Sequence, residues 1–341
     1  LIIAQLSADN TIMDHAKEKN MEKLINNAPF ALVLVFLVIG FILLIKGADF
    51  FVEGSSSAAK RLHVPSIIIG LTIVAMGTSL PETAVSVSAS LTGNNELAVS
   101  NVIGSNIFNL MVVCGMCALF CPLTVSRSTL TGEFPFSVFV ALLLMVLGWI
   151  SMTLGRIDGV ILLVFFAGFL FWMIRSAQKA RSESASDEDE YEIRPIWQCV
   201  FYIVGGAAAI AGGGQLVVNA ASAIARFFGM SQNLIGLTIV AFGTSLPELV
   251  TSIVAARKHE VDMALGNVIG SNIFNILFVL GISAALHPMV FQMENIIDII
   301  VLVVMSAIVL CFAWTKQKLV RWEGAVMLAM YAGYVVYICL R

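Results

Sequence analysis

Charged residues are scarce in this sequence of 341 residues. Asp, Glu, Lys and Arg make up 12% of it, against about 25% in a typical soluble domain. Apolar residues make up 59%, and the mean hydropathy is +0.94. So few charges cannot cover a water-facing surface of this size, which excludes soluble and disordered chains. No basic cluster is present to meet phosphates, which excludes nucleic-acid binding. An integral membrane protein is the class that remains.

Histidine and cysteine are also few. The four His residues lie in predicted tails or loops and no HExxH pattern occurs, so we expect no enzyme. The six Cys residues do not make the dense framework of a secreted disulfide module. Cys114, Cys117 and Cys121 share one face of an apolar helix. This spacing fits either a metal–thiolate cluster or small hydrophobic residues in a membrane helix, and we favour the second.

Long apolar runs predict an all-α integral membrane protein with ten transmembrane helices. A bilayer core is about 30 Å thick, so each helix needs about 20 apolar residues. Lipid offers no hydrogen bonds, so every span must satisfy its own backbone. The first span also carries Lys46, Asp49 and Glu53, which should face protein or water. The expected spans are 30–57, 65–91, 95–121, 134–154, 157–178, 196–225, 231–256, 261–286, 294–314 and 320–340.

The distribution of Lys and Arg predicts that both termini are extracytoplasmic. In that orientation twelve of these residues fall in cytoplasmic loops and six fall outside, as the positive-inside rule requires. Residues 1–28 form a polar N-terminal extension without the pattern of a signal peptide. Residues 180–195 form an acidic stretch on the cytoplasmic side, which we interpret as a solvated linker rather than a cation-sensing segment.

The sequence contains an internal repeat. GLTIVAMGTSLPE at 70–82 and GLTIVAFGTSLPE at 236–248 match at twelve of thirteen positions, at an offset of 166. NVIGSNIFNL at 101–110 and NVIGSNIFNI at 267–276 match at nine of ten, at the same offset. Five predicted helices in each half mean that the halves enter the membrane in opposite senses, as in many secondary transporters. We therefore expect two inverted-topology repeats of five helices, 29–179 and 196–341, separated by the linker.

Each GTSLPE segment predicts a broken helix with a carboxylate at membrane depth. Pro81 and Pro247 each remove a helical hydrogen bond. Broken backbone at this depth is tolerated only inside protein or beside a cavity. The Ser-x-x-Glu spacing could let each Glu cap a restarted half-helix, but Gln would cap as well. A charge at the bilayer centre costs about 2.5–3.5 kcal/mol, and two such charges repel. We therefore expect Glu82 and Glu248 to bind a cation.

The second repeated block adds hydroxyl and amide groups. Ser105 and Asn109 lie four residues apart and share a helix face, as do Ser271 and Asn275. With the carboxylates and the backbone, these groups offer only oxygen ligands, which select hard cations such as Ca²⁺ or Na⁺. Two Glu side chains balance one Ca²⁺ or two Na⁺. Competition for such a site would be the simplest form of exchange.

These blocks closely resemble the two α-repeats of the Ca²⁺/cation antiporter superfamily. From about residue 30 the chain is similar to sodium/calcium exchangers of the compact prokaryotic type. The resemblance implies ten helices, with the first and sixth as long sliding helices. It also implies location in the plasma membrane, here a prokaryotic inner membrane, with inorganic cations and the lipid bilayer as partners and no cofactor beyond the transported ions.

The resemblance also assigns site residues. It implies that Ca²⁺ is bound by Glu82 and Glu248 together with the backbone carbonyls of Thr78 and Thr244. Around Na⁺ it places two symmetric groups: Ala75, Thr78, Ser79, Glu82, Ser105 and Asn109 in the first, and Ala241, Thr244, Ser245, Glu248, Ser271 and Asn275 in the second. Some members, including K⁺-dependent ones, carry Asp at the position of Asn275, so Asn argues against K⁺ co-transport.

The predicted function is exchange of Na⁺ for Ca²⁺ by alternating access, with electrogenic Ca²⁺ export. The alternatives use the same site: a Ca²⁺/H⁺ antiporter, or a K⁺-dependent Na⁺/Ca²⁺ exchanger. A cation channel is disfavoured, because channels usually build selectivity from rings around a symmetric pore, whereas this chain carries an antiparallel two-fold repeat.

Overall fold

The computed structural model describes residues 25, 29–91, 93, 95–183, 195–230, 239 and 241–340. In the first half the elements are α2 (Phe30–Leu62), α3 (Ser66–Ile69), η1 (Gly70–Val74), α4 (Ala75–Thr78), α5 (Leu80–Leu91), α6 (Asn95–Phe108), η2 (Asn109–Val113), α7 (Cys114–Phe120), β1 (Leu123–Thr124), α8 (Arg127–Thr131), α9 (Glu133–Ser151), β2 (Thr153–Leu154) and α10 (Arg156–Glu183). In the second half they are α11 (Ile196–Phe227), α13 (Ala241–Thr244), α14 (Leu246–Arg257), α15 (Val261–Phe274), η4 (Asn275–Leu280), α16 (Gly281–Leu286), β3 (Met289–Val290), α17 (Met293–Lys316), β4 (Lys318–Leu319) and α18 (Arg321–Leu340).

The fold is that of an all-α membrane protein, as predicted. Eight helices in the described residues are long and apolar enough to span a bilayer, and the bent pair Ser66–Thr78 and Leu80–Leu91 makes a ninth span. The first half of the remaining predicted span, 231–256, lies mostly outside the described residues, as do most of the linker and the N-terminal extension. Span ends shift by a few residues. For example, α2 continues to Leu62 because His63 takes the left-handed conformation that ends many helices.

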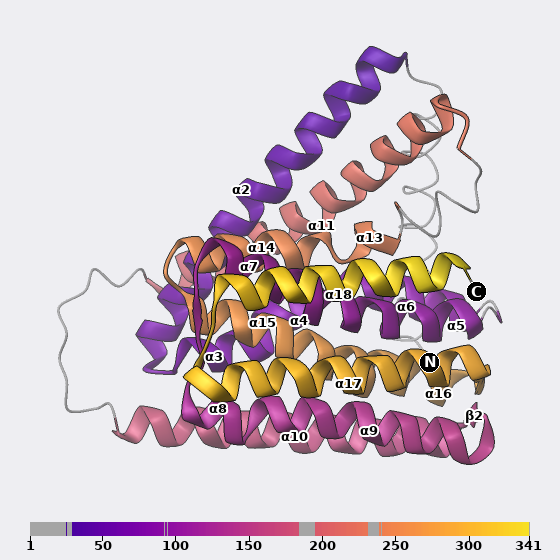
Figure 1. The fold of residues 1–341 in the computed structure, drawn as a ribbon. Coiled ribbons are helices and arrows are strands. Elements are labelled where there is room, and N and C mark those ends of the chain that lie inside the picture. Colours follow the sequence, from indigo (N-terminus) through magenta and orange to yellow (C-terminus); the bar gives the residue numbers. More distant parts are fainter. Residues whose placement is uncertain are drawn as a thin grey trace, which may run out of the picture.

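The helices pack in layers around the two broken helices. In Figure 1, α2 and α11 form a tilted pair along one side of the molecule, and α9 and α10 lie along the opposite side. The α4–α5 and α13–α14 segments lie between these sides with α6 and α15. Cys114 and Cys117 belong to the buried apolar core, in agreement with their interpretation as small hydrophobic residues.

Glycines bring α2 and α11 into close contact. Gly40, Gly47 and Gly54 recur every seven residues on α2. A Cβ atom on Gly47 would lie 3.0 Å from the carbonyl oxygen of Gly206, and one on Gly206 would lie 2.8 Å from that of Gly47. Backbone therefore meets backbone along this pair, which requires small residues at the contact.

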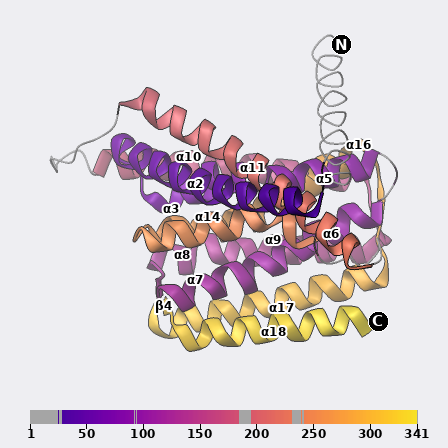
Figure 2. The ribbon, with the colours of Figure 1, turned by 90° about the horizontal axis from the view of Figure 1, so that it is seen from above.

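Two short β-ribbons connect the two halves. Leu123 pairs with Leu319 in the β1–β4 ribbon, and Leu154 pairs with Met289 in the β2–β3 ribbon. Figure 2 shows β4 at the end of the molecule opposite the C-terminal end of α18. Hydropathy did not predict these strands, because two residues are too few to give a periodic pattern.

Ionic contacts join α2 to the turn between α14 and α15. The ammonium group of Lys258 lies 2.7 Å from a carboxylate oxygen of Asp49 and 3.7 Å from one of Glu53. Glu260 accepts hydrogen bonds from Ser56 and Ser66, the latter at 3.1 Å. Asp49 and Glu53 therefore face protein, as predicted. Lys46 is different: its side chain is 68% exposed and lies 4.0 Å from Asp49.

Candidate cation site

Each GTSLPE segment breaks its helix at the serine, as predicted from the proline. Ser79 separates α4 from α5, and the two helices that meet there are bent by 51°. Ser245 occupies the same position between α13 and α14. Pro81 and Pro247 follow two residues later, where the missing N–H is not needed by a restarting helix. The Thr, Ser and Glu residues of both GTSLPE segments are buried in the interior of the molecule.

The two carboxylates lie in one site and are held by serines of the opposite repeat. The Ser79 hydroxyl donates to Oε1 of Glu248 at 2.8 Å, and the Ser245 hydroxyl donates to Oε1 of Glu82 at 2.9 Å. Both Glu residues are fully buried. Ser245 makes no side-chain capping bond to α14. The Ser–Glu hydrogen bonds therefore run between the two repeats rather than within one helix.

Several buried oxygens at this site have no protein partner in the part of the chain that the structure describes. They include the second carboxylate oxygens of Glu82 and Glu248, the Ser271 hydroxyl and the side-chain oxygens of Asn109 and Asn275. Burying an unsatisfied polar group costs about 1–3 kcal/mol. A bound hard cation would satisfy these oxygens, because Ca²⁺ and Na⁺ accept carboxylate, hydroxyl and amide oxygen as ligands. The residues present thus fit the predicted ions.

Two asparagines missed by the sequence analysis brace the broken helices. Asn101 donates to the Ser86 hydroxyl at 2.9 Å and to the backbone carbonyl of Glu82 at 3.5 Å. Asn267 makes the matching bonds, to Ser252 at 2.8 Å and to the carbonyl of Glu248 at 3.5 Å. Both asparagines begin the repeated NVIGSN block, so the repeat itself carried the signal. They fix the backbone of the residues that bear the carboxylates.

A second pair of asparagines lies where the repeats meet. Asn106 donates to the backbone carbonyl of Asn272 at 3.1 Å, and Asn272 donates to that of Asn106 at 3.2 Å. Asn275 donates to the side-chain oxygen of Asn106 at 3.2 Å. Asn109 and Asn275 each begin a π-helical turn, η2 and η4, a local widening that occurs frequently at functional sites.

The remaining predicted residues lie on the same elements. The Thr78 hydroxyl bonds to the carbonyls of Val74 and Ala75 and to Asn267 Oδ1, at 3.1–3.3 Å. The Ala75 carbonyl also accepts from the Ser79 N–H at 3.1 Å, so it is already engaged within its helix. Thr244 and Ser105 are buried. Ala241 begins α13, and its side chain lies outside the description.

We expect Asn267→Ala and Asn101→Ala each to lower the apparent Ca²⁺ affinity by about 10–100-fold, the usual effect of removing a group that orients a metal ligand. The measurement is the Ca²⁺ dependence of transport in proteoliposomes. Asn295→Ala is the control: Asn295 caps α17 and bonds to Ser100 at 3.3 Å, outside the site. If all three variants change affinity equally, the bracing role is wrong.

The long helices α2 and α11 each contact one of the two helix breaks at a glycine of the GTSLPE segment. A Cβ atom on Gly77 would lie 2.8 Å from the ring of Phe51 on α2. A Cβ atom on Gly243 would overlap the side chain of Val218 on α11. The glycine that precedes each Thr-Ser pair therefore lets α2 or α11 contact the site directly, so a movement of either helix changes the packing at a break.

Comparisons with known proteins agree with this geometry. The family model described as sodium/calcium exchanger protein matches residues 32–175 and 199–340. CaxA of Alkalimonas amylolytica, a candidate antiporter, is 41% identical over 314 residues, covering 88% of this chain and 96% of CaxA. The sodium/calcium exchanger MaX1 of Methanosarcina acetivorans is 31% identical over 341 residues, covering 89% and 97%.

A solved structure is similar over most of its length. The sodium-calcium exchanger NCX_Mj, soaked with Na⁺ and Sr²⁺, superposes with a TM-score of 0.80 at 33% identity, covering 90% of this chain and 99% of that one. The duplicated motifs, the fold and these relatives lead to one conclusion: the chain belongs to the sodium/calcium exchanger family, and is a membrane transporter rather than an enzyme.

Proposed function

We propose that this chain exchanges Na⁺ for Ca²⁺ by alternating access and that its site is formed by the residues that the resemblance assigns. In this proposal Glu82 and Glu248 bind Ca²⁺ together with Thr78 and Thr244. The observation that supports it is the reciprocal pair of Ser–Glu bonds between repeats, which leaves one oxygen of each carboxylate without a partner in the described residues.

The charges of the site explain why exchange is favoured over leak. Two buried carboxylates balance one Ca²⁺ or two Na⁺, whereas the empty site would hold two unbalanced charges. An uncompensated buried charge is strongly disfavoured. The empty protein would therefore resist the repacking that turns the site toward the other side. One Na⁺ on each side of the carboxylates, with Ser79 and Ser105 or with Ser245 and Ser271, would equal the charge of one Ca²⁺. Electrogenic exchange therefore needs a third Na⁺, as in the stoichiometry of three Na⁺ per Ca²⁺ that the resemblance implies.

Proteoliposomes test the proposal. A Na⁺ gradient, with pH clamped and K⁺ absent, is expected to drive uptake of radioactive Ca²⁺. An imposed membrane potential should change the rate, because the exchange is electrogenic. Uptake that follows only a pH gradient would overturn the Na⁺ version in favour of Ca²⁺/H⁺ antiport, and uptake that requires K⁺ would favour the K⁺-dependent version.

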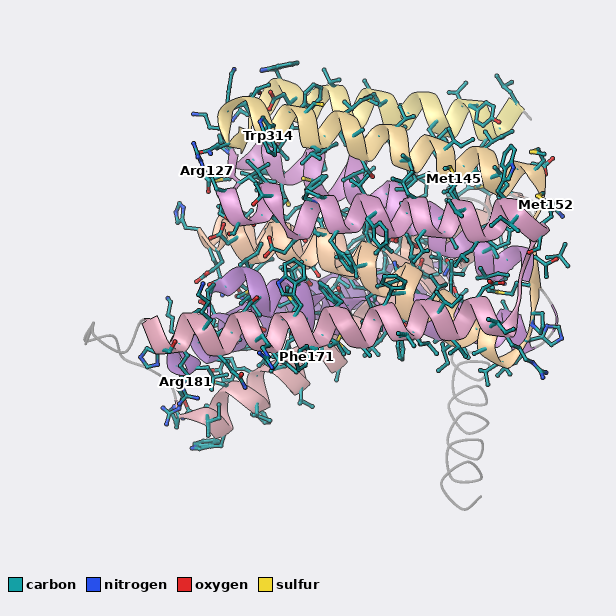
Figure 3. The ribbon with its side chains drawn as sticks, turned by 90° about the horizontal axis from the view of Figure 1, so that it is seen from below. Arg127, Met145, Met152, Phe171, Arg181 and Trp314 are labelled. Carbon is teal, nitrogen blue, oxygen red and sulfur yellow. The ribbon has the colours of Figure 1, made fainter. Side chains whose placement is uncertain are left out.

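The orientation and the division of the chain are part of the same proposal. Arg127 and Arg181, which the charge distribution places on the cytoplasmic side, lie at one end of the helix bundle, and Met152 lies at the other (Figure 3). We propose that the end with Arg127 and Arg181 is cytoplasmic and that both termini are outside. The linker 180–195 then lies between two repeats, 29–179 and 196–341. An impermeant thiol reagent applied to whole cells should then leave a cysteine placed in the linker unlabelled.

A further inference from the structure

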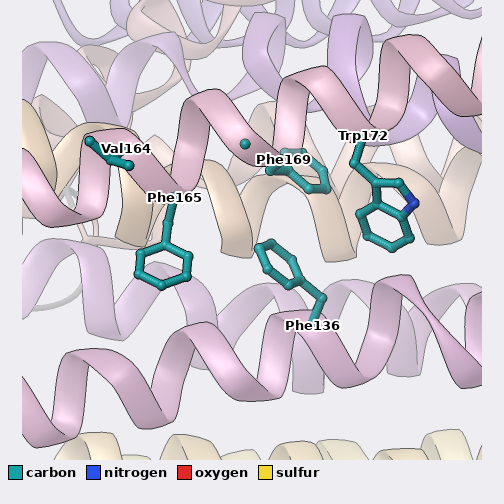
Figure 4. A pocket seen from close by; sticks show the side chains of 6 residues that line it. Phe136, Val164, Phe165, Phe169 and Trp172 are labelled. Carbon is teal, nitrogen blue, oxygen red and sulfur yellow. The ribbon is translucent and has the colours of Figure 1, made fainter.

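A groove on the outside of the bundle has a lining and a charge pattern that the exchange site does not explain. It has a volume of about 240 Å³ and lies between α9 and α10. Its lining is entirely apolar or aromatic: Phe136, Val164, Phe165, Gly168, Phe169 and Trp172. Phe136 points from α9 toward the rings of α10 (Figure 4). Val164 is 64% exposed and Trp172 is 37% exposed, so the groove opens toward the lipid that surrounds a spanning helix.

Ring contacts and a glycine shape this groove. The rings of Phe136 and Phe169 stack with centroids 5.5 Å apart, and Phe136 meets Trp172 edge-on at 6.0 Å. A Cβ atom on Gly132 would lie 3.4 Å from the Trp172 ring, so the start of α9 supports that ring. A Cβ atom on Gly168 would meet no described atom within 4 Å. The absence of a side chain at this position leaves room that a flexible chain can fill.

Basic residues continue the groove along α10. Arg175 and Lys179 follow Trp172 by three and seven residues, so all three lie on the same helix face. The Arg175 guanidinium lies 4.8 Å above the ring of Phe171, which holds it against the helix surface. Long cationic side chains near the end of a spanning helix reach toward lipid headgroups. An apolar groove that ends at these cations is complementary to an acyl chain joined to an anionic headgroup.

The second repeat provides an internal comparison. Strands β2 and β4 align at an offset of 165, which places Gly333, Tyr334 and Tyr337 of α18 opposite Gly168, Phe169 and Trp172. The glycine and the rings thus recur, and a Cβ atom on Gly333 also meets no described atom within 4 Å. At the position of Arg175, however, the second repeat has Leu340. Arg175 therefore has no cationic counterpart at the aligned position of α18.

We propose that the α9–α10 groove binds one acyl chain of an anionic glycerophospholipid, whose phosphate is held by Arg175. The experiment uses the full chain with Trp149, Trp197, Trp314 and Trp322 replaced by Phe, so that Trp172 is the one remaining tryptophan and its emission can be excited selectively. The protein is reconstituted in phosphatidylcholine containing a small fraction of brominated phosphatidylglycerol or brominated phosphatidylcholine. Quenching of Trp172 then reports the lipid in the groove.

At equal mole fraction, phosphatidylglycerol is expected to occupy the groove about fivefold more than phosphatidylcholine, the ratio equivalent to about 1 kcal/mol for one cation near an anionic surface. Arg175→Gln should remove this preference and keep quenching by both lipids. Gly168→Leu should reduce quenching by both lipids, whereas the matched variant Gly333→Leu should not. Equal quenching by the two lipids in the parent protein, or equal loss in the two leucine variants, overturns the proposal.

Discussion

Replacing Glu248 by Gln is expected to abolish Ca²⁺ transport and to leave the protein folded. Gln keeps the shape of the side chain and can still accept the hydrogen bond from Ser79, but it removes one of the two charges that are proposed to bind the cation. Loss of one partner from a buried charge pair costs about 2–5 kcal/mol, which corresponds to a decrease in Ca²⁺ affinity of about 30-fold to several thousandfold. Glu82→Gln should have a similar effect, because Ser245 holds Glu82 in the matching way.

Isothermal titration of Ca²⁺ into detergent-purified protein, together with uptake of radioactive Ca²⁺, measures this effect. Glu133→Gln is the matched control, since Glu133 is another buried carboxylate of a spanning segment but lies on α9, outside the site. Melting curves check that all three variants fold. Normal Ca²⁺ transport by Glu248→Gln would show that the carboxylates do not bind the transported ion.

Gly206→Leu is expected to destabilise the protein and to slow exchange strongly, whereas Gly205→Leu should have little effect on either. A Cβ atom on Gly206 would lie 2.7 Å from the backbone nitrogen of Phe51, so α2 and α11 would have to separate. Introducing extra atoms into a close-packed contact typically costs about 1–3 kcal/mol. At Gly205, one residue away, a Cβ atom meets no described atom within 4 Å.

The two leucine variants differ only in the helix face that they alter, so lipophilicity and helix propensity are matched. Melting temperature and the rate of Na⁺-driven Ca²⁺ uptake are the measurements. Because Phe51 also contacts the break at Gly77, a change at Gly206 should reach the cation site. Equal loss of transport in both variants would show that the glycine contact is not what makes this position sensitive.

The sequence predicted those parts of the fold that follow from local chemistry and from the repeat. Pro81 and Pro247 located the helix breaks, because proline disrupts the interior of a helix but is tolerated in the first turn of a helix that restarts. Glu82 and Glu248 were predicted to share one site, because a charge at membrane depth needs a partner, and the Ser–Glu bonds between repeats confirm that they lie together.

Contacts between distant segments could not be predicted in the same way. The bonds from Asn101 and Asn267 depend on how α6 and α15 lie against α5 and α14, which hydropathy does not describe. The crossing of the Ser–Glu bonds also needs three-dimensional information, since the sequence equally permits the capping pattern within one helix. The glycine contact of α2 with α11 was missed because its seven-residue spacing becomes meaningful only when the two helices are known to be neighbours.

The ionic contacts at Lys258 and Glu260 have a consequence for the symmetry of the transport cycle. Asp49 and Glu53 pair with Lys258 in the C-terminal half of α2, but the corresponding positions of α11 hold the neutral residues Gln215 and Asn219. Partly exposed pairs contribute about 0–1 kcal/mol each, enough to make two otherwise equivalent conformations unequally populated. In the proposed alternating-access cycle, the duplicated site would stabilise both conformations equally, whereas these ion pairs on one long helix would favour one of the two. Higher ionic strength should weaken that bias, because salt screens partly exposed charges.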